Sequence, residues 1–207
     1  RMLALLILAA PPHTAKAADG AAPLGLPPLV SSAPRPTAAQ VALGEKLFFD
    51  RRLSINGTLS CAMCHVPAQG FTVNELRTSV GMEGVSLRRN APTLLNVAYV
   101  NALFVDGRAP SLEAQALQPM VHPDEMANPD IATVMKRITA LRDYQVPLQR
   151  AFGSRTPNPR RIAAALAAYE RTLVAAASPF DRWRFGSGPN ALGAQEQRGF
   201  ALFVERG

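Results

Sequence analysis

The stretch Cys61-Ala62-Met63-Cys64-His65 decides the fold of this chain. Two thiols separated by two residues and followed directly by an imidazole are what covalent attachment of a c-type haem requires. Each thiol can form a thioether with one haem vinyl group, and the imidazole then lies beneath the ring, where it binds the iron as an axial ligand. The chain has no cysteine outside this stretch, which therefore predicts one haem c.

Three other uses of two closely spaced cysteines fit the sequence less well. A disulfide between Cys61 and Cys64 would close a strained loop with little entropic gain. A zinc site would need further cysteine or histidine ligands close by, and the sequence has none next to this stretch. A thioredoxin-like redox pair would need a surrounding βαβ pattern, which the sequence does not show.

Length and composition limit the remaining possibilities. The 207 residues allow one domain or at most two small ones, and a hydrophobic content of 48% is enough to bury a core. The formal net charge is +7, but the arginines form no basic stripe with interleaved aromatic residues, so nucleic-acid binding is not predicted. A mildly basic surface can still steer an acidic electron-transfer partner.

The N-terminus has the pattern of an export signal, and we expect the given sequence to begin inside that signal. Residues 2–10 are apolar and follow Arg1, but this run is too short to span a bilayer and is stopped by two prolines. Ala15-Lys16-Ala17 supplies the small residues of a signal-peptidase site. We expect a cleaved signal peptide over 1–17, an Ala- and Pro-rich lead-in over 18–36, and a periplasmic protein without a stable membrane anchor. Export agrees with the haem stretch, because bacteria attach c-type haem outside the cytoplasm.

Capping signals predict that helices make up the rest of the chain. Thr37 and Gln40 form a capping box for a helix that ends near Asp50. Further helices are expected to begin at Ser111, Asn128-Pro129 and Asn158-Pro159, and a last one to cover 193–204. Short helices are also favoured within 93–105. Because no stretch alternates convincingly with a period of two, the predicted fold class is all-α.

The last predicted helix repeats the pattern of the first. Residues 42–50 read ALGEKLFFD and lead to the haem stretch, and residues 197–205 read QRGFALFVE, with similar spacing of glycine, aliphatic and aromatic residues. If this echo is an internal repeat, a second Cys-x-x-Cys-His would follow soon after Gly207. We therefore expect a haem domain over 37–186 and the first helix of a truncated second haem domain over 187–207.

Five separated blocks carry a resemblance to a known family. They are LGEKLFFDRRLSINGTLSCAMCH (43–65), RRNAPTLLNVAY (88–99), DGRAPSLEAQALQPM (106–120), HPDEM (122–126) and AALAAYERTLVAAASPFDRW (164–183). Together they resemble the bacterial di-haem cytochrome c peroxidases and their methylamine-utilisation-type relatives. The resemblance implies two cytochrome c-like haem domains, with hydrogen peroxide reacting at the N-terminal haem and the second haem supplying or storing an electron. It also implies a calcium ion between the domains, for which Asn90 resembles a ligand.

Three residues of this chain match the distal pocket of that family. The resemblance places Gln115, Pro119 and Glu125 there, and Cys61, Cys64 and His65 at the attachment and axial positions. Chemistry agrees with the distal assignment, because a carboxylate can move a proton between the two oxygens of peroxide and an amide can orient them by hydrogen bonding. Without the resemblance, a glutamate near a proline turn is more often a solvated loop residue, and a glutamine an exposed one.

The chain departs from the family pattern at three places. Where the family has a tryptophan before Asp-Gly-Arg that relays electrons between the haems, this chain has Val105, which has no accessible oxidised state. Where some members have a distal histidine, it has Met82, whose thioether could bind the iron but which more often would pack against apolar neighbours. His122 is a rival ligand close to Glu125, although a surface histidine is the simpler interpretation. The third departure is the missing second haem domain.

Three functions follow from these observations. The first is a periplasmic c-type haem peroxidase that reduces hydrogen peroxide to water with electrons from a small redox protein such as a cytochrome c or a cupredoxin. The second is a relative that uses peroxide to oxidise a protein during cofactor maturation. The third is an electron carrier without catalysis, which Glu125 argues against and Met82 weakly supports. A homodimer is left open.

Overall fold

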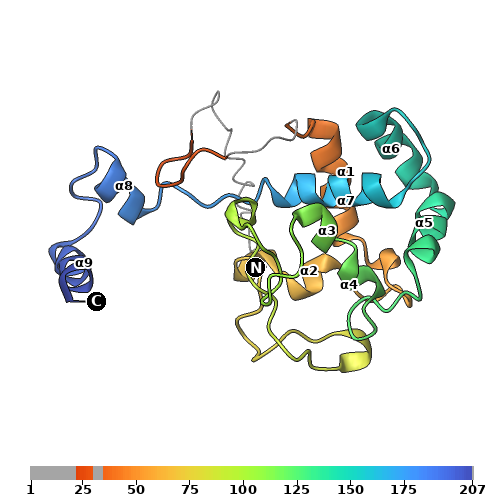
Figure 1. The fold of residues 1–207 in the computed structure, drawn as a ribbon, viewed down its shortest axis with the longest axis horizontal. Coiled ribbons are helices and arrows are strands. Elements are labelled where there is room, and N and C mark those ends of the chain that lie inside the picture. Colours follow the sequence, from red (N-terminus) through yellow and green to blue (C-terminus); the bar gives the residue numbers. More distant parts are fainter. Residues whose placement is uncertain (1–21, 30–34, 207) are drawn as a thin grey trace, which may run out of the picture. The chain divides into compact units, whose positions relative to one another are not determined.

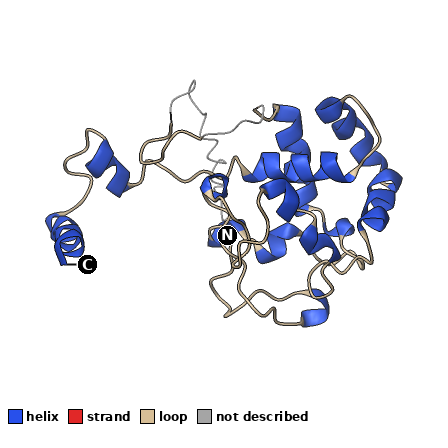
Figure 2. Cartoon of the chain, in the orientation of Figure 1, coloured by secondary structure: helices blue, strands red, loops and turns tan. Residues whose placement is uncertain are grey.

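The computed structural model describes residues 22–29 and 35–206. Within these ranges the regular elements are α-helices and 3-10 turns without any strand, and the loops contain three isolated bridges (Figure 2). The all-α prediction is therefore confirmed. The predicted signal peptide lies outside the described residues, as do parts of the predicted lead-in. None of the described helices is long and apolar enough to cross a membrane.

The described residues form two compact units. One comprises 35–175, and the other comprises 22–29 together with 176–206. The first unit contains these helices and 3-10 turns: α1 Ala38–Phe49, η1 Arg51–Leu53, α2 Cys61–Cys64, η2 Pro67–Gln69, η3 Met82–Gly84, η4 Val97–Tyr99, α3 Leu112–Gln115, α4 Gln118–Val121, α5 Ile131–Ala140, η5 Arg142–Tyr144, α6 Gln145–Phe152 and α7 Pro159–Glu170 (Figure 1). The second contains α8 Pro179–Phe185 and α9 Ala194–Arg206. The predicted domain boundary at residue 186 stays a prediction.

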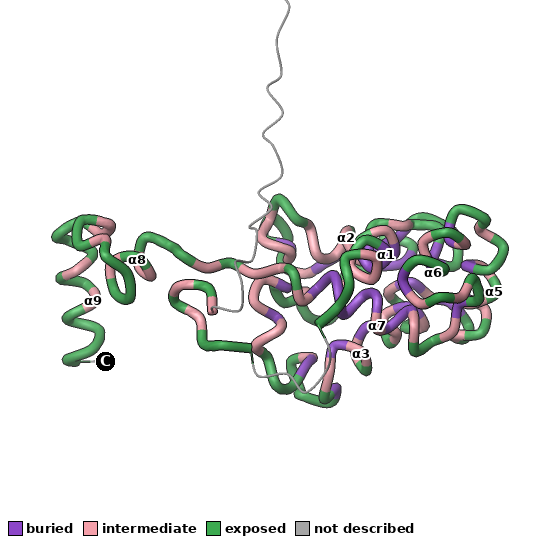
Figure 3. The backbone as a smooth tube through the Cα atoms, turned by 90° about the horizontal axis from the view of Figure 1, so that it is seen from above, coloured by how far each residue is buried: buried purple, intermediate pink, exposed green. Residues whose placement is uncertain are grey.

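Helix α1 begins where the capping box predicts. The Thr37 hydroxyl accepts a hydrogen bond from the Gln40 backbone N–H, and the Gln40 side chain accepts one from the Thr37 N–H. The side chains of Leu43, Leu47 and Phe48 are buried on one face of the helix. This face packs on α7, the most extensive contact between any two described elements, and forms the buried centre of the unit (Figure 3).

Gly44 allows α1 and α7 to cross closely. A Cβ at this position would overlap the backbone carbonyl of Ala165 and lie 2.8 Å from the Cβ of Tyr169. Only glycine fits such a crossing, because any larger side chain would push the two helices apart.

The other helix starts agree with the sequence at two positions and differ at one. Ser111 caps α3, and Asn158 caps α7 with Pro159 in the first turn. The prediction that Asn128 caps a helix is wrong, because Asp130 caps α5 through its side chain. Asn128 is instead buried, and its amide donates to the carbonyls of Leu53 and Met120, each at 2.8 Å.

The region 66–110 is mostly loop, as expected for its first part. Of the short helices expected within 93–105, only the 3-10 turn η4 forms. Three isolated bridges, Val66–Thr72, Val80–Ser86 and Leu103–Ala109, each close a short hairpin.

The second unit has an aromatic cluster and one helix with an exposed apolar face. Phe180 and Trp183 of α8 lie with their ring centroids 5.2 Å and 5.4 Å from that of Phe200 in α9. Helix α9 confirms the predicted last helix, and its Phe203 is 75% exposed.

Candidate haem site

Helix α2 is a single turn that carries both cysteines. Ser60 precedes it in extended conformation, and the His65 backbone N–H closes the turn by donating to the Cys61 carbonyl at 2.9 Å. Cys61 and Cys64 are both free thiols and both half-buried. One helical turn therefore presents the two sulfurs and the imidazole as a single group, which is the geometry that the sequence predicts for haem attachment.

The His65 ring is oriented by a backbone carbonyl. Its Nδ1 lies 3.1 Å from the Phe71 carbonyl, which also accepts a hydrogen bond from the Leu94 N–H at 3.3 Å. With Nδ1–H donating to this carbonyl, Nε2 keeps its lone pair for a metal. Burial lowers the pKa of His65 and so favours the neutral imidazole that can bind iron.

Phe48 connects this ring to the core. Its ring centroid lies 6.5 Å from that of His65, 6.2 Å from that of Phe71 and 5.2 Å from that of Tyr169 in α7. The axial histidine is therefore supported by the buried face of α1 rather than by the surface loops alone. Such packing restricts the orientation of the ring.

The two thiols have different neighbours. Burial, and to a lesser extent the charge of the buried Glu170, raise the pKa of the Cys61 thiol to about 12. Burial also raises the pKa of Cys64, while a hydrogen bond with Ser79 opposes the shift. Neither thiol is thus activated for redox exchange, in contrast to the lowered pKa of a thioredoxin-like pair.

The residues around α2 fit a haem. Among the described residues, the Tyr99 hydroxyl and the Glu170 Oε2 are buried without a hydrogen-bond partner. Buried polar atoms without a partner point to a missing group. Glu170 lies near Cys61, on whose thiol its charge acts, and the segments that carry Tyr99 and Glu170 meet where the Asn96 N–H donates to the Leu173 carbonyl at 2.8 Å. Two free thiols and an oriented imidazole make the donor set of a c-type haem.

Glu125 lies near the haem-attachment turn, although it is distant in sequence. Its charge contributes to the raised pKa of both Cys61 and Cys64. The preceding residue, Asp124, accepts a hydrogen bond at its carbonyl from the Met82 N–H at 2.8 Å. Burial raises the pKa of Glu125, although the charges of His122 and Arg108 oppose the shift. Because its pKa is raised, the Glu125 carboxyl exchanges its proton closer to neutral pH than a solvent-exposed carboxyl does.

Gln115 and Pro119 lie on the two short helices that precede this loop. Gln115 is the last residue of α3 and is half-buried, and Pro119 stands in the first turn of α4. The Pro119 carbonyl accepts a hydrogen bond from the Met126 N–H at 3.1 Å. This bond holds the Glu125 loop against α4, so the three predicted distal residues belong to one local assembly.

His122 is an exposed neighbour of Glu125. Its Nδ1 lies 3.9 Å from Glu125 Oε1 and accepts a hydrogen bond from the Asp124 N–H at 3.2 Å. A distance of 3.9 Å is longer than a hydrogen bond, so His122 is a neighbour of Glu125 and not its hydrogen-bond partner.

Two further candidates have structural partners. Met82 is buried at the tip of the hairpin that follows Ser79. Asn90 donates to the Val73 carbonyl at 2.6 Å, and its side-chain oxygen lies 3.4 Å from the Ser79 hydroxyl. In the described part of the chain no three His, Cys, Asp or Glu side chains gather as a metal site. The iron-ligand role of Met82 and the calcium role of Asn90 stay predictions.

Val105 is on the surface. It is 70% exposed at the turn between Leu103 and Ala109. The same turn places the Arg108 guanidinium 3.5 Å from the centroid of the Phe104 ring. The position that holds the relay tryptophan in the resembled family is therefore an exposed aliphatic side chain here.

Sequence reasoning missed three residues of this site. Phe71 orients His65 through its backbone carbonyl and has a positive φ of 57°, which no residue pattern indicates. Ser79 and Glu170 approach the cysteines only because distant segments meet. A serine two residues before a glycine and a glutamate at a helix end are too common in sequences to predict such contacts.

These features define the class of protein: an all-α protein with a c-type haem-attachment stretch. More particularly, residues 38–188 match the di-haem cytochrome c peroxidase family, and the chain belongs to this family.

Relatives support the assignment. The chain is 47% identical over 169 residues to the methylamine utilization protein MauG of Methylorubrum extorquens, covering 81% of this chain and 47% of that protein. It is 40% identical over 171 residues to the cytochrome c551 peroxidase of Nitrosomonas europaea, covering 82% and 50%. The chain thus spans about half the length of the curated relatives that it matches.

Solved structures agree with the sequence comparison. The diheme peroxidase BthA of Burkholderia thailandensis superposes with a TM-score of 0.72 at 33% identity, covering 82% of this chain and 47% of that one. A MauG-like protein associated with microbial copper homeostasis gives a TM-score of 0.73 at 32% identity, covering 88% and 55%. The cytochrome c-like fold of the described core is therefore shared with haem peroxidases.

Proposed function

We propose that this protein reduces hydrogen peroxide to water at the haem held by Cys61, Cys64 and His65, using electrons from a small redox protein. The observation that carries the proposal is the position of Glu125, a half-buried carboxyl near the haem-attachment turn whose pKa is raised by burial. A plain electron carrier has no use for a proton-transfer group there. The relatives named cytochrome c peroxidases support the same function.

The residues of the site divide the tasks of the reaction. A haem held here would supply a redox-active iron. His65 would bind that iron, with its ring oriented by the Phe71 carbonyl. Glu125 would move a proton from one oxygen of peroxide to the other, so that one oxygen leaves as water, while two electrons from the donor and two further protons convert the other oxygen into a second water. Gln115 orients the peroxide by hydrogen bonding, and Pro119 keeps the Glu125 loop in place through its carbonyl.

The setting of the reaction is also part of the proposal. We place the protein in the periplasm, with a cytochrome c or a cupredoxin as donor. A second haem, and a calcium ion bound with the help of Asn90, are implied by the family, of whose curated members this chain spans about half the length.

A second candidate function has specific support. Two relatives at 47% and 41% identity are methylamine utilization proteins MauG, so a peroxide-dependent oxidation of another protein is the alternative. Val105 argues against it, since an aliphatic side chain cannot relay an oxidising equivalent to a distant protein substrate.

The experiment that tests the proposal is peroxide consumption by the haem-loaded protein. It uses N,N,N′,N′-tetramethyl-p-phenylenediamine, a small uncharged reductant, as electron donor. We expect sustained turnover with two reductant molecules oxidised per peroxide. No consumption above the rate of free haem would reject the peroxidase function.

A further inference from the structure

A row of aromatic rings leads from His65 to the surface. The ring centroid of Phe48 lies 6.5 Å from that of His65, and the ring centroid of Tyr169 lies 5.2 Å from that of Phe48. Phe49 is 44% exposed, and its centroid lies 5.2 Å from that of Phe48 and 6.2 Å from that of Tyr169. These separations are typical of aromatic rings in contact. The four rings therefore form a continuous path of π-systems that starts at the expected axial ligand.

Two closely packed helices hold this path in place. Phe48 and Phe49 belong to α1 and Tyr169 to α7, and no two described elements share a more extensive contact than these helices. The Phe48 side chain is fully buried, and Tyr169 is 8% exposed. A ring fixed by close packing keeps its distance to its neighbours, so the path is a stable feature of the core.

Tyr169 is the member of this row that gives up an electron most readily, because a phenol is oxidised far more easily than the ring of phenylalanine. An oxidised phenol also loses its proton, so a nearby carboxylate favours the oxidation. Burial and, to a lesser extent, the charges of Glu45 and Glu170 raise the pKa of Tyr169 to about 12. Both carboxyls therefore lie close enough to act on the phenol, and the exposed Glu45 can pass a proton on to solvent.

The other two tyrosines of the chain lack this combination. Among the residues that the structure describes, neither Tyr99 nor Tyr144 pairs with another aromatic ring. The Tyr99 hydroxyl is buried without a hydrogen-bond partner, so no described group is placed to take its proton. Lys46 and Arg52 place positive charges 4.8 Å and 5.8 Å from the centroid of the Tyr144 ring. These charges oppose the removal of an electron from that ring.

Val105 gives an oxidisable residue in this place a use. The family has a relay tryptophan at that position, whereas the exposed valine of this chain cannot be oxidised. The donor and the second haem that the family implies stay the source of electrons in normal turnover. When peroxide reacts before such an electron arrives, the missing electron must come from the protein itself. Tyr169 can supply it at a defined site, which spares the other residues around the haem.

We propose that Tyr169 gives one electron through Phe48 to the haem of this chain when peroxide reacts in the absence of donor electrons, and that it is left as a tyrosyl radical. The proposal rests on the proposed peroxidase function, which supplies the oxidant. As the O–O bond breaks, the haem and Tyr169 each supply one electron, and one oxygen leaves as water with both hydrogens of the peroxide. The O–H bond of Tyr169 breaks, and its proton passes to the Glu45 carboxylate. Two later electrons from a donor, two protons from solvent and the proton returned by Glu45 convert the second oxygen into water and restore the phenol.

The test detects the radical directly by electron paramagnetic resonance. The haem-loaded chain in its ferric form is mixed with peracetic acid, without any reductant, and frozen. This peracid takes up two electrons and leaves as acetic acid whether or not Glu125 moves a proton, so the measurement does not depend on the peroxidase function. We expect a radical signal that narrows when the chain is produced with ring-deuterated tyrosine. The signal should be lost in Tyr169→Phe, which keeps the ring and removes only the hydroxyl.

The matched control is Tyr99→Phe/Tyr144→Phe, which leaves Tyr169 as the sole tyrosine of the chain. The tyrosyl signal should persist in this double variant. The visible spectrum of each ferric variant checks that its haem site is intact. A second readout is the bleaching of the haem by excess peracetic acid, which should be faster in Tyr169→Phe than in the control.

Three results would overturn the role of Tyr169. They are the absence of a tyrosyl signal in the wild type, a signal that survives in Tyr169→Phe, or a signal that is lost in Tyr99→Phe/Tyr144→Phe. Hydrogen peroxide consumption with the small uncharged reductant decides separately about the function. Turnover without a tyrosyl radical rejects the role of Tyr169 and keeps the peroxidase function. A radical on Tyr169 without turnover rejects the peroxidase function and keeps the redox role of Tyr169.

Discussion

Glu125 and Asn128 lie three residues apart in the chain and show two different uses of a polar side chain. Glu125 is half-buried and close to the haem-attachment turn, without a short hydrogen bond to any described residue. Asn128 is 2% exposed and fully committed to hydrogen bonds. A carboxyl without a hydrogen-bond partner at an accessible site can transfer protons. A buried amide whose hydrogen bonds are all made can only hold neighbouring segments together.

Changing Glu125→Gln should slow peroxide consumption by about 10²–10⁴-fold, because the amide keeps the shape of the side chain but cannot accept the proton. Haem content and the visible spectrum should remain those of the wild type. The measurement is the initial rate of peroxide loss by the haem-loaded protein. A matched control is His122→Gln, for which we expect a rate close to the wild type. An unchanged rate in Glu125→Gln would contradict the acid–base role.

Changing His65→Ala should remove the axial ligand while leaving both thioethers intact. The haem would then stay bound through denaturation, but the spectrum of the iron should change, because imidazole ligation is lost. Absorption spectroscopy combined with the mass of the denatured chain checks both statements. A native-like spectrum in the variant would show that another residue is the axial ligand.

Changing Asn128→Ala should destabilise the protein by about 2–4 kcal/mol, because the buried carbonyls of Leu53 and Met120 each lose a donor. Urea unfolding of the haem-loaded protein measures this loss. Asn74→Ala, at an exposed position, serves as control and should stay within about 0.5 kcal/mol of the wild type. A similar small effect at Asn128 would mean that water replaces the amide.

At the scale of elements, the crossing of α1 and α7 sets the frame of the haem site. Changing Gly44→Ala should cost about 3 kcal/mol or more, since the added Cβ would collide with the Ala165 carbonyl. Gly199→Ala in α9 meets no atom within 4 Å and should be neutral or stabilising by up to about 1 kcal/mol. Thermal unfolding of the two variants compares them directly. Equal stability would show that the helices separate easily.

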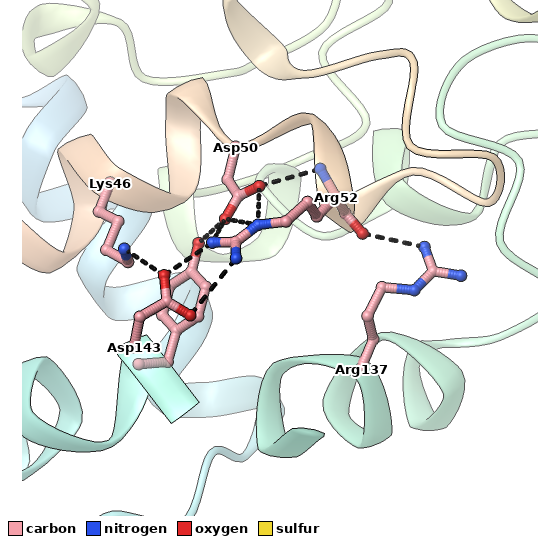
Figure 4. A network of polar contacts seen from close by, with 6 residues as sticks. Lys46, Asp50, Arg52, Arg137 and Asp143 are labelled. Carbon is pink, nitrogen blue, oxygen red and sulfur yellow. Dashed lines mark hydrogen bonds and ion pairs between the residues drawn. The ribbon is translucent and has the colours of Figure 1, made fainter. Parts of the chain in front are cut away.

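A polar network joins the end of α1 to η1 and η5. Arg52 lies between two carboxylates, with its Nη2 2.6 Å from Asp50 and 2.8 Å from Asp143, and the Lys46 Nζ lies 2.7 Å from Asp143 (Figure 4). The Tyr144 hydroxyl donates to Asp50 at 2.7 Å. Burial opposes ionisation of Asp50, but the hydrogen bonds from Arg52 and Tyr144 prevail and lower its pKa.

This lowered pKa gives stability a predictable dependence on pH. A carboxyl with a depressed pKa stabilises the fold above its unfolded value of about 3.9, and the contribution disappears as pH falls through the folded value. Asp50→Asn should therefore be less stable than the wild type at pH 7 by about 1–3 kcal/mol. The difference should shrink below about pH 4. Chemical unfolding at a series of pH values measures it, and a constant difference would show that the charge of Asp50 has no part in it.

At the scale of the whole molecule, the haem content tests the assignment most directly. We expect one haem per copy of this chain, bound so firmly that it survives denaturation, because two thioethers attach it. Mass spectrometry of the denatured protein counts it. Cys61→Ala/Cys64→Ala is the control and should lose the haem on denaturation.

The haem-attachment stretch, the all-α class and most helix starts can be predicted from the amino-acid sequence alone. Each depends on residues that are close in the chain: Cys61 to His65 within one turn, and Thr37 with Gln40 within one capping box. The distal residues could be named only by their resemblance to a family. The approach of Glu125 to the cysteines depends on contacts between segments that lie far apart in sequence.

Only the tertiary structure decided how these pieces meet. Asn128, predicted as a helix cap, is buried in the structure, where its amide donates hydrogen bonds to the Leu53 and Met120 carbonyls. The tertiary structure brought the Phe71 carbonyl to His65, and the Met82 N–H to the Asp124 carbonyl beside Glu125. Local patterns specify helices because their hydrogen bonds are local. A site depends on which distant segments the packing of α1 on α7 brings together, and no short pattern contains that information.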